Sequence, residues 1–76
     1  MRELIDYIAK ALVDAPDAVE VTELGDAEAS VVKLKVAKDD LGKVIGKKGR
    51  TAKAMRTLLG AAALKSNKRT SLEILE

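Results

Sequence analysis

The sequence predicts an α+β domain in which three helices pack on one face of a three-stranded sheet, in the order helix, strand, strand, helix, helix, strand. Two observations predict this class. Apolar residues recur at the helical period in three segments, and they alternate with polar residues in three shorter ones. The 76 residues contain no linker and no internal repeat, so they predict one domain, residues 1–76, whose small core leaves little room for a deep pocket.

The first helix is predicted over residues 2–14. Its apolar residues form one stripe, and Pro16 prevents the helix from continuing. Tyr7, the only aromatic residue of the chain, is expected to be a partly buried residue of this helix. The stripe consists of Leu4, Ile5, Ile8, Ala9, Leu12 and Val13.

A hairpin is predicted next. Val19 and Val21 alternate with polar residues, which indicates a short strand, and residues 25–28 have the composition of a turn. The strand that follows has the clearest alternation in the chain. Its apolar positions are Val32, Leu34 and Val36, separated by Lys33 and Lys35.

Two helices and a strand complete the chain. Asp39 or Asp40 is expected to cap a short second helix, which ends at Gly46 because glycine adopts a left-handed conformation without steric cost. The third helix begins near Gly49 or Arg50. A loop at residues 65–69 and a last strand at residues 70–76 follow. The second helix would bury Leu41, Val44 and Ile45; the third would bury Ala52, Met55, Leu59 and Ala62, with Leu58 beside them; the strand would bury Leu72 and Ile74.

Charge is unevenly distributed along the chain. Residues 1–30 hold two basic and eight acidic residues, a net charge of −6, whereas residues 31–76 hold twelve basic and four acidic residues, a net charge of +8. This asymmetry is typical of a polyanion-binding face, although charge alone does not distinguish such a face from an ordinary solvated surface. From Leu41 to Leu72 no residue is acidic and nine are basic: Lys43, Lys47, Lys48, Arg50, Lys53, Arg56, Lys65, Lys68 and Arg69.

The segment Gly46-Lys47-Lys48-Gly49 joins two predicted helices. The amino end of a helix presents unpaired N–H groups and partial positive charge, which favour phosphate. Glycine at both corners lets a sugar-phosphate chain approach these amides, and the lysines add charge. Arg50, Lys53 and Arg56 follow at three-residue spacing and extend the basic side. The segment therefore predicts a contact with a nucleic-acid backbone, while a plain turn with solvated lysines is the alternative.

Other functional classes are disfavoured. The chain has no Cys and no His, so it lacks a thiol nucleophile and the most common metal ligand. A phosphate loop that starts at Gly42 would need a second glycine where Lys47 stands. A dinucleotide fingerprint that includes Gly46 would need a glycine where Val44 stands. We expect no enzymatic activity, metal or cofactor. The acidic, amphipathic opening segment differs from a signal peptide, and no apolar run reaches membrane-spanning length, so a cytoplasmic protein without a membrane partner is expected.

The segment VIGKKGRTAKAMRTLL resembles the V-I-G-x-x-G signature of the KH domain. The element order looks like the type II arrangement of that domain. The whole chain, including RTAKAMRTLLGAAA, resembles the small single-domain bacterial KH proteins of the KhpA family. Ala52 departs from the large aliphatic residue that KH domains often have three positions after the second glycine.

The resemblance implies that the loop clamps about four nucleotides of single-stranded RNA. The bases would lie in an apolar groove between the flanking helices and a strand, with Val44, Ile45 and Ala52 as candidates for its wall, although core packing is the alternative for Val44 and Ile45. Lys33 and Lys35 would line its open side or face solvent. The predicted RNA-binding residues are Lys43, Val44, Ile45, Gly46, Lys47, Lys48, Gly49, Arg50, Lys53 and Arg56.

The predicted function is RNA binding, with affinity mainly from phosphate neutralisation and weak sequence preference, because no aromatic residue lies near the loop. The resemblance implies a small post-transcriptional regulator or RNA chaperone, linked in some bacteria to cell division, envelope growth or cell shape. It also implies a homodimer, or a heterodimer with a larger Jag-type KH protein.

Two alternatives remain at the level of sequence. One is a protein-interaction or dimerisation module with little intrinsic RNA binding, in which the acidic first helix of one copy contacts a basic surface of another. The second is a DNA-binding helix-turn-helix with Arg50, Lys53 and Arg56 on the recognition helix, although this helix has no Asn or Gln for direct reading of bases.

Overall fold

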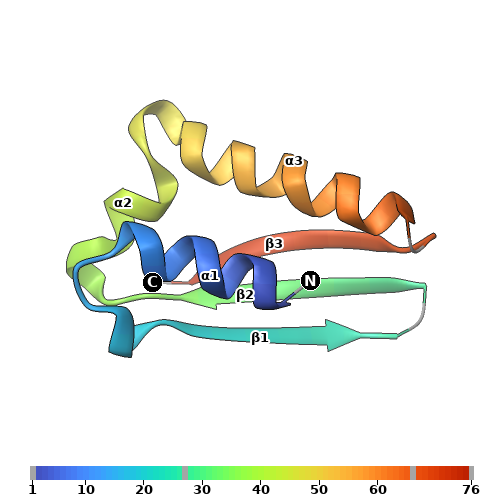
Figure 1. Ribbon diagram of the computed structural model, residues 1–76, viewed down its shortest axis with the longest axis horizontal. Helices are drawn as coiled ribbons and strands as arrows, with labels where there is room; N and C mark the ends of the chain where they lie inside the picture. The colour runs from blue at the N-terminus through green and yellow to red at the C-terminus, as the bar shows by residue number, and fades with distance from the viewer. Residues whose placement is uncertain (1, 27, 66, 76) are drawn as a thin grey trace.

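The computed structural model describes residues 2–26, 28–65 and 67–75 and confirms the predicted fold class and element order (Figure 1). Short 3₁₀ turns join some of the main elements. The helices and strands are α1 (Arg2–Leu12), β1 (Glu20–Gly25), β2 (Ala29–Lys35), α2 (Leu41–Ile45), α3 (Arg50–Lys65) and β3 (Arg69–Leu75), and the 3₁₀ turns are Pro16–Ala18, Lys38–Asp40 and Lys47–Gly49.

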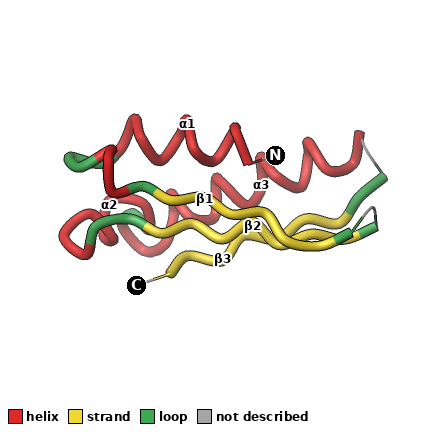
Figure 2. Tube along the Cα trace, turned by 90° about the horizontal axis from the view of Figure 1, so that it is seen from below, coloured by secondary structure: helices red, strands yellow, loops and turns green. Residues whose placement is uncertain are grey.

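The sheet has the order β1-β2-β3, with β1 antiparallel to β2 and β2 parallel to β3. Asp26 forms the hairpin turn: its Oδ1 accepts hydrogen bonds from the amides of Glu28 and Ala29, both at 2.9 Å. The three helices lie on one face of the sheet, and the other face is uncovered (Figure 2). Lys33 and Lys35 alternate with buried residues of β2, so they belong to the uncovered face.

The core fills the space between the helices and the sheet. β2 is the central strand. Because successive side chains of a strand point to opposite faces of the sheet, every second residue of β2 is buried beneath the helices. α1 packs over β1 and β2, and α3 packs over β3 (Figure 1). The buried core cluster consists of Ile5, Ala9, Val32, Leu34, Val36, Val44, Met55, Leu59 and Leu72.

Several details correct the sequence-based expectations. Tyr7 is 76% exposed instead of partly buried, because it lies on the side of α1 opposite the buried Ile5 and Ala9. Ala63 is buried in place of Ala62, since it follows Leu59 by four residues and stays on the buried stripe of α3. Leu58, beside that stripe, is about half exposed.

The boundaries of two elements differ from prediction for identifiable reasons. α1 ends at Leu12, two residues early, because the amides of Asp14 and Ala15 donate to the Asp40 carboxylate instead of to the helix. β3 begins at Arg69, whose amide donates to the carbonyl of Glu28 at 2.9 Å. Asp40 is the N-cap residue of α2, as predicted, but its side chain makes no cap hydrogen bond to that helix and accepts from the amides of Asp14 and Ala15 instead.

Candidate nucleic-acid interface

The predicted loop is the short turn between α2 and α3. It forms a bend at one end of the molecule, drawn yellow-green in Figure 1. Gly46 has φ 79° and ψ 170°, Gly49 has φ 73°, and Lys48 between them has φ 58°. The amide of Gly49 donates to the carbonyl of Gly46 at 3.1 Å and closes the turn. Both glycines therefore occupy backbone conformations that other residues rarely adopt.

Lys48 is a feature that the sequence did not reveal. It holds a left-handed conformation without being glycine, asparagine or aspartate. This conformation costs a residue with a Cβ roughly 1–2 kcal/mol, which the surrounding turn must offset. Nothing in a Gly-Lys-Lys-Gly sequence indicates which lysine has this backbone.

Five exposed basic side chains lie on the turn and along the first two helical turns of α3. None of them forms an ion pair with another residue of the described ranges. Arg50, Lys53 and Arg56 follow one another at three-residue steps along α3, and each step turns about 300° around the helix axis. Their side chains therefore move only gradually around one side of the helix. This basic rail consists of Lys47, Lys48, Arg50, Lys53 and Arg56.

Lys43 behaves differently from the basic rail. Its Nζ forms an ion pair with Asp14, and it lies 3.3 Å from Oδ1 of Asp40. The hydrogen bond to Asp14, followed by the one to Asp40, raises the pKa of Lys43 above its ordinary value. The structure thus brings Lys43 close to two carboxylates, whereas the other predicted cations are unpaired within the described part of the chain.

The predicted apolar residues divide into two groups. Val44 is fully buried in the core and Ala52 lies on the buried side of α3, so neither side chain is exposed to a base in this structure. Ile45 is 37% exposed at the carboxyl end of α2, immediately before Gly46. Of the three candidates for a groove wall, Ile45 alone presents accessible surface beside the turn.

Thr51 is a contributor to the turn that sequence reasoning missed. A Cβ on Gly46 would lie 2.7 Å from Cβ of Thr51 and 2.8 Å from its backbone nitrogen. The first turn of α3 therefore packs directly against the first glycine. A threonine two residues after the second glycine gives no sequence signal for this contact.

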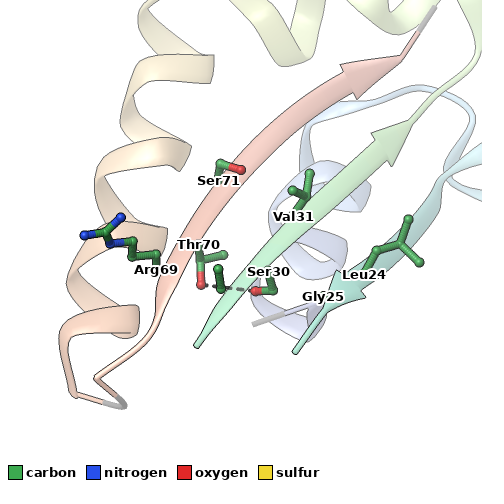
Figure 3. Close-up of a pocket in the computed structure, with 8 residues that line it drawn as sticks. Leu24, Gly25, Ser30, Val31, Arg69, Thr70 and Ser71 are labelled. Carbon is green, nitrogen blue, oxygen red and sulfur yellow. Dashed lines mark hydrogen bonds between the residues drawn. The ribbon is translucent and has the colours of Figure 1, made fainter. Parts of the chain in front are cut away.

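A shallow hollow of about 270 Å³ lies at the hairpin end of the sheet (Figure 3). The turn between α2 and α3 lies at the other end of the molecule (Figure 1). Residues of all three strands line the hollow, and the hydroxyls of Ser30 and Thr70 form a 3.3 Å hydrogen bond there. The candidate interface is thus an exposed surface and not this hollow. Within residues 2–26, 28–65 and 67–75, no cluster of acidic side chains is arranged to hold a metal ion, and no helix is long and apolar enough to span a membrane.

The mixed sheet, the helices on one face and the glycine-bounded turn between α2 and α3 define a type II KH domain. The family described as KhpA/KhpB, KH domain, matches residues 2–74. The chain belongs to this family.

Similar proteins cover nearly the whole chain. RNA-binding protein KhpA of Caldanaerobacter subterraneus subsp. tengcongensis is 59% identical over 75 residues, which cover 99% of this chain and 100% of that protein. RNA-binding protein KhpA of Clostridium acetobutylicum is 53% identical with the same coverage. RNA-binding protein KhpA of Borreliella burgdorferi is 47% identical, covering 97% of this chain and 90% of that protein.

A solved structure shares the fold. It is a crystal structure of Era in complex with MgGDPNP and a segment of 16S ribosomal RNA. The TM-score is 0.56 at 24% identity, and the match covers 96% of this chain and 28% of the Era chain. The similarity establishes the fold, and this chain corresponds to about a quarter of that longer protein.

Proposed function

We propose that this protein binds single-stranded RNA through the sugar-phosphate backbone at Gly46–Gly49. The observation that carries the proposal is the exposed turn, whose two positive-φ glycines and unpaired basic rail lie at the start of α3. Membership of the KhpA/KhpB family and the names of the relatives support the same ligand.

Phosphate neutralisation provides most of the affinity in this proposal. Tyr7 lies on α1 and is the only aromatic residue of the chain, so no aromatic platform for base stacking adjoins the turn. Ile45 offers a small apolar contact to a base beside Gly46. We therefore infer weak sequence preference and strong dependence on salt.

The cellular role is proposed on the resemblance to the family. The protein acts as a small RNA chaperone or post-transcriptional regulator in the cytoplasm, connected with cell division and cell shape, and it catalyses no reaction. This role requires only reversible binding of RNA.

A second proposal concerns self-association. Leu58 and Leu64 of α3 are exposed, and Leu64 is 79% exposed. The exposure of these two leucines supports a homodimer or a heterodimer with a larger Jag-type KH protein. If this association were the main function, variants that abolish RNA binding would still associate and would keep the protein's effect in the cell.

The test compares two matched pairs of substitutions by fluorescence anisotropy with labelled single-stranded RNA. Lys47→Gln/Lys48→Gln neutralises the turn, and Lys33→Gln/Lys35→Gln removes the same charge from the uncovered sheet face. We expect the first variant to bind at least about tenfold more weakly and the second to bind nearly as the wild type. Circular dichroism and gel filtration check the fold and the oligomeric state.

The contrary results are equally clear. Equal weakening by both pairs would mean that net charge, and not the turn, determines binding. Tighter binding of duplex DNA than of single-stranded RNA would contradict the proposed ligand and favour a helix-turn-helix.

A further inference from the structure

Asp40 is a buried acidic residue directly before α2, and the proposed function gives it no task. Only 2% of its surface is exposed. Its carboxylate accepts hydrogen bonds from the amide of Asp14 at 3.2 Å, the amide of Ala15 at 3.0 Å and Nζ of Lys43 at 3.3 Å. Lys43 also pairs with Asp14, so these side chains form a closed cluster. We call the Asp40 carboxylate and its three donors the Asp40 clasp.

The clasp joins two elements that are far apart in sequence. Asp14 and Ala15 follow α1, whereas Lys43 belongs to α2. A buried carboxylate is costly unless its oxygens are satisfied, and no buried side-chain oxygen or nitrogen of the described residues lacks a partner. Burial raises the pKa of Asp40, but the two amide hydrogen bonds and Lys43 outweigh it and hold the pKa below its ordinary value. The charged form therefore fastens the end of α1 to the start of α2.

The position of α2 depends on such contacts. α2 has five residues, and a helix this short is unstable by itself. Its core contacts are the buried Val44 and the partly buried Leu41, and the clasp lies at its amino end. Five helical residues span only about 7.5 Å, so the orientation of α2 determines where Gly46 and the turn begin.

We propose that Asp40 is a positioning residue for RNA binding: the clasp orients α2 and thereby holds the Gly46–Gly49 turn in the conformation that contacts phosphate. This inference rests on the proposed function. Lys43 acts in the clasp and contributes no phosphate contact.

Charge and positioning predict opposite outcomes for the loss of Asp40. A negative charge near a basic turn disfavours RNA, so removing it by Asp40→Asn would strengthen binding if charge alone mattered. If Asp40 positions the turn, the same substitution weakens binding. Asp39→Asn is the matched control, since the side chain of Asp39 is exposed and makes no hydrogen bond or ion pair within the described ranges.

The experiment measures RNA affinity for the wild type, Asp39→Asn and Asp40→Asn by anisotropy across a salt series, at a temperature where each protein is folded by circular dichroism. We expect Asp39→Asn to bind as well as the wild type or slightly better. Asp40→Asn should bind about 2- to 30-fold more weakly, the range for a residue that acts through its neighbours. Its salt slope should be unchanged because the phosphate contacts remain. If Asp40→Asn is partly unfolded, sucrose is added to restore the fold before binding is measured.

Lys43→Met supplies a second test that retains the two amide donors of the clasp. We expect modestly weaker binding with an unchanged salt slope. A slope smaller by about 0.7 would show a direct phosphate contact and contradict the role assigned to Lys43. Folded Asp40→Asn that binds as tightly as the wild type, or more tightly, would overturn the inference for Asp40.

Failure of the inference and failure of the proposed function give different patterns. If Lys47→Gln/Lys48→Gln binds RNA as the wild type does, the proposed function is wrong and the inference falls with it. If that variant loses binding while folded Asp40→Asn does not, the turn still binds RNA and only the positioning role is rejected.

Discussion

Gly46 and Thr51 are packed so closely that a Cβ on the glycine would lie 2.7 Å from Cβ of the threonine and 2.8 Å from its backbone nitrogen. The second glycine of the turn is different, because a Cβ on Gly49 would meet no atom within 4 Å. Both glycines, Gly46 and Gly49, have positive φ, but only Gly46 also lacks space for a Cβ. The two glycines of one motif are thus required for different physical reasons.

This difference predicts unequal effects of alanine at the two positions. Gly46→Ala should displace the first turn of α3 and nearly abolish RNA binding, whereas Gly49→Ala carries only the backbone cost of roughly 1–2 kcal/mol. Urea unfolding and RNA anisotropy on both variants measure the effects. Thr51→Ala should not rescue Gly46→Ala, because the backbone nitrogen would still obstruct the Cβ. A successful rescue, or equal effects at both glycines, would refute this explanation.

Because Lys48 has a left-handed backbone, one substitution can remove its charge without adding to the conformational cost of the turn. Lys48→Asn removes the charge but keeps a residue that tolerates positive φ. The free energy of unfolding should stay the same or rise by less than about 1 kcal/mol, while the salt slope of RNA binding becomes shallower by about 0.7. Lys47→Asn is the control, since Lys47 is not among the described residues with positive φ. In Lys47→Asn the salt slope of RNA binding should become shallower by a similar amount, and the free energy of unfolding should not rise.

The clasp predicts a loss of stability in acid. Because the folded state holds the pKa of Asp40 below its ordinary value, the unfolded chain binds the proton first as the pH falls. The stabilisation is therefore complete above the ordinary pKa of about 4 and is lost as the pH falls through the folded-state pKa. Asp26 acts in the same direction, since the amides of Ala29 and Glu28 lower its pKa.

Urea unfolding of the wild type and Asp40→Asn between neutral pH and about pH 3 tests this expectation. The variant should be less stable at neutral pH, and the difference between the two proteins should narrow below about pH 4. A difference that stays constant over the whole range would mean that the charge of Asp40 contributes no stability.

Sequence patterns predicted most of the fold because the apolar periods are clear. The alternation of Val32, Leu34 and Val36 marks the central strand, and the stripe of α1 marks a helix packed on one side. The Gly46–Gly49 turn was also placed correctly between two helices. Each of these features depends on residues close together in the sequence.

The missed features depend on residues far apart in the sequence or on local backbone geometry. The carboxylate of Asp40 accepts hydrogen bonds from amides 26 and 25 residues earlier, which no local pattern indicates. The ion pair between Lys43 and Asp14 could not be predicted either, because Pro16 and the whole hairpin separate the two residues in the sequence. The left-handed backbone of Lys48 follows from the closure of the turn and not from its side chain.

The central claim is that RNA contacts the Gly46–Gly49 turn, and an NMR titration of isotopically labelled protein with single-stranded RNA tests it most directly. We expect the largest shifts of backbone amide signals from Gly46 to Arg50, with smaller ones at Ile45 and Lys53. The amides of Lys33 and Lys35 on the uncovered sheet face should stay unchanged. The largest shifts on that face or on α1, with the turn unaffected, would contradict the account.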